Sequence, residues 1–522
     1  MERTPTAADR VTAWAARVPW WRLLRTATWG VAVLQVGIVG YAVCRRVGYP
    51  YELEWMEGAV AEHVRRLLAG APLYVAPSLE FVPYLYPPLY YAAGAPLAAV
   101  MGAGFLPLRL LSVAATLACA ALVYHLAARP DTTGGKPDRE AGFVAAALFV
   151  GAYFAGGAWF DVARVDMLFL ALFLGGVAAA RRRTGGAYAL AGLLLGLALL
   201  TKQVGLLAGL PLLAYAFLVD GRRALPFAGA AALVGGGGIV ALHLASGGWS
   251  TFYILAMPGA HPVVPSNHSA FLLTSLFEPF PIAACLAGVA VVAGLRRGDA
   301  LWVALALGAG AAVLASRLHV GGHMNVLIPL YAVGGALAGR GLTVLRSTAA
   351  GMGARRPAAL ALLYGALVLQ FLGLVEHPMT RVPWAADRAS AQRLEAHLAT
   401  LPRPAYITTP GYLAVRAGHP RQADLLAVWD VLRSDTEVGR RFRAELEATF
   451  AARRYARIVL PDMIFTEGFE PEPHYRRVGD LGVTLYGASG TFKRFTGHPA
   501  YLRYVYAPAT TGAPAPSPSA AP

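Results

Sequence analysis

Long apolar runs alternate with short polar segments along most of the chain, and this pattern predicts membrane helices. Runs long enough to cross about 30 Å of hydrocarbon lie near 23–44, 107–128, 141–158, 225–246, 271–295, 300–316, 325–345 and 358–375. Shorter apolar runs lie near 166–180, 187–200 and 203–219. A further segment, 89–104, is short and contains a proline and several glycines, so its role depends on the charges around it.

The basic residues decide how these runs are arranged, because cytoplasmic loops hold the excess of Lys and Arg. The basic clusters between the runs are Arg10, Arg17 and Arg22, then Arg129, Lys136 and Arg139, then Arg181–Arg183, Arg222 and Arg223, Arg296 and Arg297, and Arg346, Arg355 and Arg356. All of them fall on one side only if 89–104 lies at the outer interface without crossing. The sequence therefore predicts about eleven crossings, with the N-terminus inside and the C-terminus outside.

Unusual polar residues of the membrane part gather on the face that this arrangement places outside. The loops on that face are 45–106, 159–165, 201–202, 247–270, 317–324 and everything after about 376. We therefore expect the outer loops to form one functional surface at the plasma (inner) membrane.

Composition supports a membrane protein and argues against two other classes. The 522 residues are 57% hydrophobic and 14% charged, with a mean hydropathy of +0.51, whereas soluble domains carry roughly 25% charged residues. The net charge of +16 is split into short clusters, which does not favour a nucleic-acid-binding face. Cys44, Cys119 and Cys285 lie in or beside apolar runs, so they predict neither a disulfide framework nor a metal site.

The composition changes after Glu376, where charged residues return. Short β-prone runs at 405–409, 456–461 and 482–487 surround a charged helical stretch near 433–454. This alternation predicts a small α/β domain outside the membrane. The predicted organisation is a cytoplasmic N-terminus at 1–22, a transmembrane domain at 23–375 with a first outer loop at 45–106, an exterior domain at 376–506 and a disordered tail at 507–522.

Three glutamates stand close together at the start of the first outer loop. Glu52, Glu54 and Glu57 follow Gly48 and Pro50, which end the first membrane helix. The following residues, from about 56 to 68, are amphipathic, which predicts a helix at the membrane interface. A carboxylate held there can act as a general base for an acceptor hydroxyl. The alternative is an ordinary solvated turn beside the membrane.

A second group of charges, Asp161, Arg164 and Asp166, begins the short run at 166–180. Asp166 can cap the helix that follows, but three charges at one rim of the membrane favour a polar cavity. Arg164 is a candidate phosphate ligand. Lys202 lies between two short runs in a chain with only three lysines, and it is a second candidate phosphate ligand or a snorkelling side chain.

Further polar residues lie on the same outer face. Arg317, His319, His323 and Asn325 precede the run at 325–345, and Arg317 is a candidate phosphate ligand. The histidines lack the spacing of metal ligands, so the sequence leaves open whether the protein binds a divalent metal.

Aromatic residues at the outer boundary can bind sugars or isoprenoid chains. Tyr84 and Tyr86 belong to the segment YLYPPLYY, although aromatic belts are common at this depth. The loop 247–270 adds His261 and His268 as a weaker indication of a sugar or prenyl site.

The order of these motifs resembles the GT-C superfamily of membrane glycosyltransferases, especially the protein O-mannosyltransferase and aminoarabinose-transferase-like group (glycosyltransferase family 39-like). The motifs are the acids of the first outer loop, LLAGAPLY around Gly70, YPPLYY, the R-x-D of the next outer loop and T-K-Q between two short helices. The resemblance covers roughly residues 23–345. It implies an all-α membrane bundle with a large catalytic first loop and a polyprenyl-phosphate-linked sugar as donor.

The resemblance also implies site residues. The family commonly has an Asp-Glu pair in the first loop, with the Asp as base. Here Glu57 matches the Glu and Met56 occupies the Asp position, which makes Glu54 the implied substitute, with Glu52 in reserve.

The remaining motifs of the resemblance concern the donor. Arg164 and Asp166 match the second-loop motif of the family, and Lys202 is implied to approach the donor phosphate. Taken together, the sequence predicts transfer of a sugar, with inversion, to a lipid, glycan or protein hydroxyl at the outer face. Membrane lipids are expected partners and nucleic acid is not, while the sugar, the acceptor, the prenyl length and the oligomeric state stay open.

Two other functions are weighed against the glycosyltransferase. A lipid or sugar transporter would show charges near the middle of the membrane and repeated broken helices, whereas the charges here gather at one rim. A non-catalytic scaffold or polymer-assembly subunit with the same fold is the stronger rival, because Met56 replaces the expected acid. Transfer activity with the lipid donor separates these possibilities.

Overall fold

The apolar runs of the sequence form long helices in the computed structural model, which describes residues 19–129, 135–264, 274, 277–318, 322–407, 411–461, 470–481, 495–496 and 502–509. From the N-terminus, the first helices are α2 (Trp20–Val47), α3 (Glu57–Leu68), α4 (Leu89–Met101) and α5 (Phe105–Ala128). They are followed by α6 (Arg139–Ala155), α7 (Asp166–Ala180), α8 (Gly185–Thr201), α9 (Gly205–Asp220), α10 (Leu225–Ala231) and α11 (Gly237–Ala245). The last group is α12 (Trp249–Thr251), α13 (Met257–Gly259), α15 (Pro281–Arg297), α16 (Leu301–Leu318), α17 (Ile328–Ala350) and α18 (Arg356–Gly373).

Most helix boundaries agree with the sequence pattern. The run predicted at 271–295 differs, because α15 begins only at Pro281, a residue suited to the first turn of a helix. Residues 271–273 and 275–276 of that run lie outside the described residues. The segment 89–104 is helical as α4, with Pro96 inside it.

Five helical stretches in the described part of the chain are long and apolar enough to cross a membrane, namely Trp20–Val47, Phe105–Ala128, Gly205–Ala245, Met324–Ala350 and Gly353–Thr380. The helices α4, α7, α8 and α16 are apolar but shorter. The architecture is therefore that of a multi-pass membrane protein, and the expected number of eleven crossings and the orientation stay predictions.

Helix α17 is the most buried of these stretches and forms the centre of the bundle. It packs closely on α6 and α15 because it presents glycines at the contacts. A Cβ atom at Gly339 would collide with the backbone carbonyl of Ala141, and one at Gly341 would collide with that of Leu286. Small residues allow membrane helices to approach in this way.

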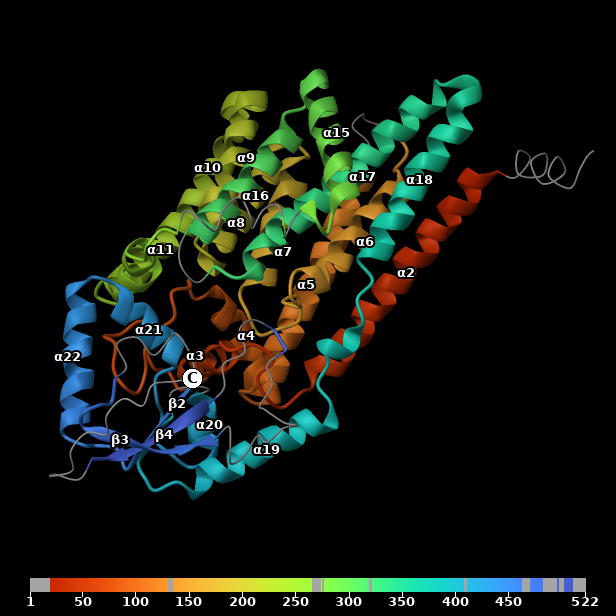
Figure 1. Ribbon diagram of the computed structural model, residues 1–522. Helices are drawn as coiled ribbons and strands as arrows, with labels where there is room; N and C mark the ends of the chain where they lie inside the picture. Colours follow the sequence, from red (N-terminus) through yellow and green to blue (C-terminus); the bar gives the residue numbers. More distant parts are fainter. Residues whose placement is uncertain are drawn as a thin grey trace, which may run out of the picture.

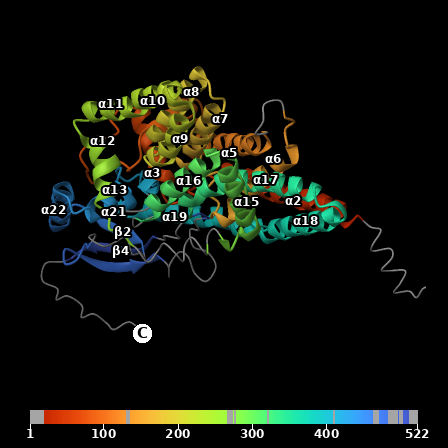
Figure 2. The same ribbon diagram turned by 90° about the horizontal axis from the view of Figure 1, so that it is seen from above.

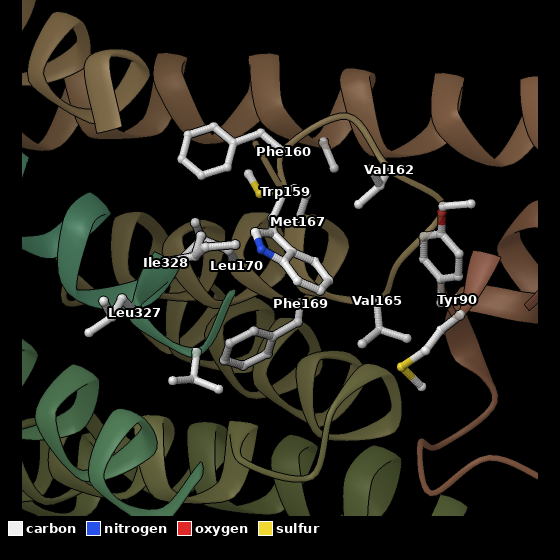
Figure 3. Packing of buried hydrophobic residues seen from close by; sticks show 14 of the residues in the cluster. Tyr90, Trp159, Phe160, Val162, Val165, Met167, Phe169, Leu170, Leu327 and Ile328 are labelled. Atoms are coloured by element: carbon white, nitrogen blue, oxygen red, sulfur yellow. The ribbon is translucent and has the colours of Figure 1, made fainter. Parts of the chain in front are cut away.

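The loop between α6 and α7 is packed into the bundle instead of extending into solvent. Trp159, Phe160 and Val162 are buried, and Figure 3 shows them in one apolar cluster with Leu170 of α7 and Ile328 at the start of α17. Close packing on several sides fixes the backbone of this loop. The side chains at the end of this loop are therefore attached to a rigid backbone.

The C-terminal part is a small α/β unit, as the sequence predicts. Its helices are α19 (Ala385–Thr400), α20 (Gly411–Arg416), α21 (Leu425–Arg433) and α22 (Glu437–Ala451). Its strands are β1 (Ala405–Ile407), β2 (Arg457–Pro461), β3 (Tyr475–Asp480) and β4 (Leu502–Pro508). The sheet order is β1-β2-β4-β3, in which β1 pairs with β2 in parallel and the other pairs are antiparallel.

The sequence missed two of these strands. β3 and β4 carry charged and aromatic residues and lack a clear apolar alternation, and β4 ends against the Pro/Ala-rich tail. The strand expected at 482–487 lies outside the described residues.

This C-terminal unit rests on the first outer loop. Figure 1 shows its blue elements beside α3 at one end of the long helices, and the turned view of Figure 2 keeps this grouping. The backbone N–H of Ala423 donates to the carbonyl of Leu79 at 2.9 Å, and that of Phe495 donates to the carbonyl of Leu53 at 3.0 Å. The unit is therefore joined to the loop that carries the three glutamates.

Candidate active site

The first outer loop is folded around the carboxylate of Glu57. Arg109 of α5 donates to it twice, at 2.8 Å to Oε1 and 2.6 Å to Oε2. The backbone N–H groups of Leu53 and Ala163 also donate to it, at 2.7 and 2.8 Å. Burial disfavours the charge, but Arg109 and these donors hold the pKa of Glu57 below its ordinary value. Glu57 is thus ionised at neutral pH and fastens the loop to α5 and to the next outer loop.

The other two glutamates of the loop have different partners. Glu52 accepts a hydrogen bond from the backbone N–H of Gly58 at 3.0 Å. Glu54 accepts one from the N–H of Met56 at 3.0 Å and lies 3.3 Å from Nη1 of Arg164. All three carboxylates are buried, and Glu54 is the one that pairs with a cation of the second outer loop.

Arg164 links the two outer loops. Its Nη2 donates to the hydroxyl of Tyr86 at 2.8 Å, and its guanidinium lies 5.4 Å from the ring centres of Tyr86 and Trp159. Burial disfavours the charge, but Glu54 and Tyr86 raise the pKa of Arg164 above its ordinary value. A permanently charged guanidinium is therefore held between a carboxylate and two aromatic rings.

A second ion pair forms at the start of α7. Asp166 Oδ1 accepts a hydrogen bond from Nζ of Lys202 at 2.7 Å and another from Nδ2 of Asn325 at 3.1 Å. Its Oδ2 lies 3.9 Å from Nε of Arg164. The carboxylate thus brings together the start of α7, the turn between α8 and α9 and the segment before α17.

These charges surround a cavity of about 360 Å³, which we call the site cavity. Its cations are Arg164 and Lys202. Its aromatic residues are Trp55, Tyr86, Trp159 and Trp429. Its other polar residues include Gln203, His261, His323, Asn325 and Asp430, and Met56, Leu85, Leu207 and Ile254 belong to its apolar wall. A pocket with a few converging polar groups in an apolar wall is typical of a ligand site.

One family model matches part of the sequence, and solved structures share most of the fold. Residues 86–249 match the family model of dolichyl-phosphate-mannose-protein mannosyltransferase. The structure is similar to ArnT from Cupriavidus metallidurans bound to undecaprenyl phosphate, with a TM-score of 0.55 and 16% identity over 92% of this chain and 98% of that chain. The chain therefore has the fold of ArnT.

Other comparisons are consistent with this assignment. The apo state of the same ArnT gives a TM-score of 0.55 at 17% identity, again over 92% of this chain and 98% of that one. The archaeal oligosaccharyltransferase AglB from Archaeoglobus fulgidus, in complex with an inhibitory peptide and a dolichol-phosphate, gives 0.51 at 12% identity over 93% of this chain and 75% of that chain. The sequence has no significant match among curated proteins.

The site cavity and its charged partners bring together most of the predicted residues, but not all of them. Arg164, Lys202, His323, Asn325 and Tyr86 line the site cavity, and Glu54 and Asp166 lie directly behind Arg164 and Lys202 as their partners.

Four predicted residues lie away from the cavity lining. Glu57 binds Arg109 of α5, and Glu52 accepts from the backbone N–H of Gly58. The hydroxyl of Tyr84 donates to Asp424 of the C-terminal unit at 3.1 Å. Arg317 donates to the backbone carbonyl of Gly322. His268 and His319 lie outside the described residues.

Asp161, which the sequence groups with Arg164, has a different partner in the structure. It forms a fully buried ion pair with Arg46 of α2, at 2.7 Å from Nε to Oδ2. The same guanidinium donates to Thr496 at 2.8 Å and to the carbonyl of Arg381 at 2.7 Å. Arg46 and Asp161 therefore join the bundle to the C-terminal unit and stand apart from the site cavity.

Sequence reasoning missed the part of the site that the C-terminal unit supplies. Asp430 of α21 is the sole carboxylate among the described residues that line the cavity. Burial, reinforced by the negative charge of Asp424, raises the pKa of Asp430 to about 8. Its Oδ1 lies 3.6 Å from Nε2 of His261. The sequence signal for Asp430 is a single Asp in the otherwise apolar face of LLAVWDVLR. Nothing in the sequence shows which face of the bundle this helix contacts.

No group of three or more His, Cys, Asp or Glu side chains that could hold a metal ion occurs within the described residues. The positive groups that face the cavity are the side chains of Arg164 and Lys202. Both cations can bind an anion.

Proposed function

We propose that this chain transfers a sugar from a polyprenyl-phosphate donor to an acceptor hydroxyl at the outer face of the membrane, with inversion at the anomeric carbon. The observation that carries the proposal is the pair of cations, Arg164 and Lys202, in one partly apolar cavity at the end of apolar helices. The matched family is named for a dolichyl-phosphate sugar donor, and the ArnT structure holds undecaprenyl phosphate. These likenesses support a lipid-linked phosphate as the donor group.

The two cations suit the charge that develops during transfer. The acceptor oxygen forms a bond to the anomeric carbon while the bond from that carbon to the phosphate oxygen breaks. The leaving polyprenyl phosphate gains one negative charge, and the acceptor proton moves to a carboxylate. Arg164 offers paired N–H donors and Lys202 a compact ammonium group, and such donors stabilise a developing oxyanion most strongly in a water-poor cavity.

Glu54 is the proposed base. Its carboxylate lies 3.3 Å from Arg164, and Met56, beside it in the chain, lines the cavity. When the donor phosphate attracts Arg164, Glu54 shares its cation with a second anion, which raises its proton affinity. Glu57 is proposed to support the loop, because Arg109 and two backbone N–H groups already bind it.

The test compares glutamates of the same loop after purification. Glu54→Gln should fold and lose sugar transfer from a labelled polyprenyl-phosphate donor by about 10²–10⁴-fold. Glu62→Gln is the matched control, since Glu62 pairs with Arg65 on the outer side of α3, and it should retain full transfer. Glu57→Gln should chiefly lower thermal stability by weakening the buried pair with Arg109. Full activity in both the Glu54 and Glu57 variants would contradict the catalytic role of the loop.

A non-catalytic subunit of the same fold is the second candidate, and Met56 favours it. This thioether faces the cavity at the position where the family has its acid. Such a subunit would bind the lipid donor without transferring the sugar. Binding of labelled donor with no transfer to any hydroxyl acceptor would therefore favour this second candidate.

A further inference from the structure

One hydroxyl group of the C-terminal unit lies where α2, the first outer loop and the loop between α6 and α7 meet. It belongs to Thr496, which is buried and follows Phe495 between β3 and β4 in the chain. Its Oγ1 accepts a hydrogen bond from Nη2 of Arg46 at 2.8 Å and donates one to the backbone carbonyl of Ala158 at 3.0 Å. A hydroxyl can fill both roles, because it carries a donor as well as acceptor lone pairs.

The backbone of the same two residues holds the first outer loop beside the proposed base. The N–H groups of Phe495 and Thr496 both donate to the carbonyl of Leu53, at 3.0 and 2.9 Å. The N–H of Leu53 donates in turn to Oε2 of Glu57 at 2.7 Å. Leu53 directly precedes Glu54 in the chain. The backbone from which the Glu54 side chain extends is therefore fixed from the C-terminal unit.

The hydroxyl of Thr496 also holds the second outer loop, which lies between α6 and α7. Its acceptor, Ala158, directly precedes Trp159, which lines the site cavity. Its donor, Arg46, also binds Asp161 of this loop at 2.7 Å. Arg164 comes shortly after Asp161 in the same loop and lines the cavity. Both contacts of the hydroxyl thus fix the backbone just before this cation.

The proposed reaction requires a fixed distance between Glu54 and Arg164. Their side chains approach to 3.3 Å, although the two residues are 110 positions apart in the chain. A misplacement of about 1 Å at a reacting group can lower a rate by about a hundredfold. Thr496 binds the backbone of both loops, one through its N–H and the other through its hydroxyl. It is therefore well placed to fix this distance.

We propose that Thr496 is a positioning residue for sugar transfer, whose hydroxyl and N–H groups hold the two outer loops so that Glu54 and Arg164 keep their distance. Its effect on catalysis rests on the proposed function. Thr496 is not among the described residues that line the site cavity. It therefore acts through the loops, and the C-terminal unit contributes to the geometry of the reaction as well as to the fold.

Thr496→Val tests this role, because valine has nearly the same shape but can neither accept nor donate a hydrogen bond. In the purified full chain, amide hydrogen exchange should become about tenfold faster at 52–58 and 158–164, and stay unchanged in the membrane helices. The kcat for transfer from a labelled polyprenyl-phosphate sugar should fall at least about fivefold. The donor KM should stay within about twofold of wild type, because both cations of the cavity remain.

Two further substitutions separate the hydroxyl from the fold. Thr496→Ser keeps the hydroxyl, so its loop exchange and kcat should match wild type within about twofold. Thr496→Ala removes the hydroxyl and leaves room for a water molecule between Arg46 and Ala158, so it should fold even where the valine variant does not. Its kcat should still fall about threefold, because a mobile water holds the loops less firmly.

The matched control is Tyr475→Phe, which removes another buried hydroxyl of the C-terminal unit. This hydroxyl accepts from the N–H of Tyr455 and donates to the carbonyl of the same residue, each at 3.1 Å, so both contacts stay within the unit. Loop exchange and kcat should remain as in wild type. Equal changes in Tyr475→Phe and Thr496→Val would indicate a general loosening of the unit and overturn the proposal. Wild-type kcat in Thr496→Val would overturn it as well.

A failure of the proposed function would give a different result. If the wild type transferred no sugar to any hydroxyl acceptor, the proposed function would be wrong, and amide exchange would still test the hold of Thr496 on the loops. Faster exchange at both loops in Thr496→Val would confirm this hold. Exchange like that of wild type would overturn it.

Discussion

The site cavity and the junction between the bundle and the C-terminal unit both pair cations with carboxylates, but they differ in what surrounds each pair. In the site cavity, Arg164 and Lys202 each pair with a buried carboxylate and also line open space. At the junction, Arg46 and Asp161 form an ion pair that the protein encloses completely. A cation that lines a cavity can take up a phosphate and release it again, whereas an enclosed cation holds two parts of the fold together. This difference separates a proposed reaction site from a structural contact within one molecule.

The largest expected effect comes from removing the carboxylate that cancels charge in the site cavity. In Asp166→Asn, Lys202 and Arg164 gain net positive charge, so the product polyprenyl phosphate should bind about tenfold more tightly, by roughly 1.4 kcal/mol. Its release should become slower, and kcat should fall by up to about tenfold where release limits the rate. Steady-state kinetics with added polyprenyl phosphate as product inhibitor measures both changes.

The control for this change lies outside the site cavity. Asp299→Asn removes a carboxylate just before α16, and the Asn side chain can still accept the N–H of Leu301, as Asp299 does at 3.2 Å. Sugar transfer and product inhibition should stay as in wild type. If Asp166→Asn weakened product binding, the idea that this carboxylate cancels charge would be wrong.

A smaller effect is expected from pH, because Asp430 changes charge inside the site cavity. With a pKa of about 8 the side chain is neutral at pH 7 and becomes negative as the pH rises. The new charge repels an anionic donor, so the donor KM should rise by about fivefold between pH about 7 and about 9.5. The groups around Asp430 are His261 at 3.6 Å and the charges of Asp424 and Arg433.

Two variants separate Asp430 from other groups that titrate in this range. Asp430→Asn should remove the rise in KM, because its side chain stays neutral. Asp435→Asn is the matched control, since the Asp435 side chain is 96% exposed, and it should keep the wild-type profile. A rise in KM that persists in Asp430→Asn would assign the titration to another group.

The helices and the residues proposed to bind the donor could be predicted from the sequence, because both depend on local features of the chain. Apolar runs predict helices wherever they lie, and Arg164, Asp166 and Lys202 stand out because charges are rare beside such runs. The chain order of these motifs also indicated the fold. The charge pattern indicated a common face, and the structure brings Asp166, Lys202 and Asn325 together there.

What the sequence could not predict depends on partners far apart in the chain. The sequence could not show that Glu57 binds Arg109, because Arg109 lies 52 residues later in an apolar helix. Asp430 lies in a different domain, and its place at the cavity depends on how the C-terminal unit docks on the first loop. No periodicity or composition encodes such docking, since it results from packing between surfaces that are separate in sequence.

The most direct test of the central claim is a structure of the full chain with a non-reactive polyprenyl-phosphate sugar analogue. The account predicts the phosphate within about 3 Å of side-chain nitrogen atoms of both Arg164 and Lys202, with the sugar beside Glu54. A phosphate bound elsewhere on the protein, with the site cavity unchanged, would contradict it.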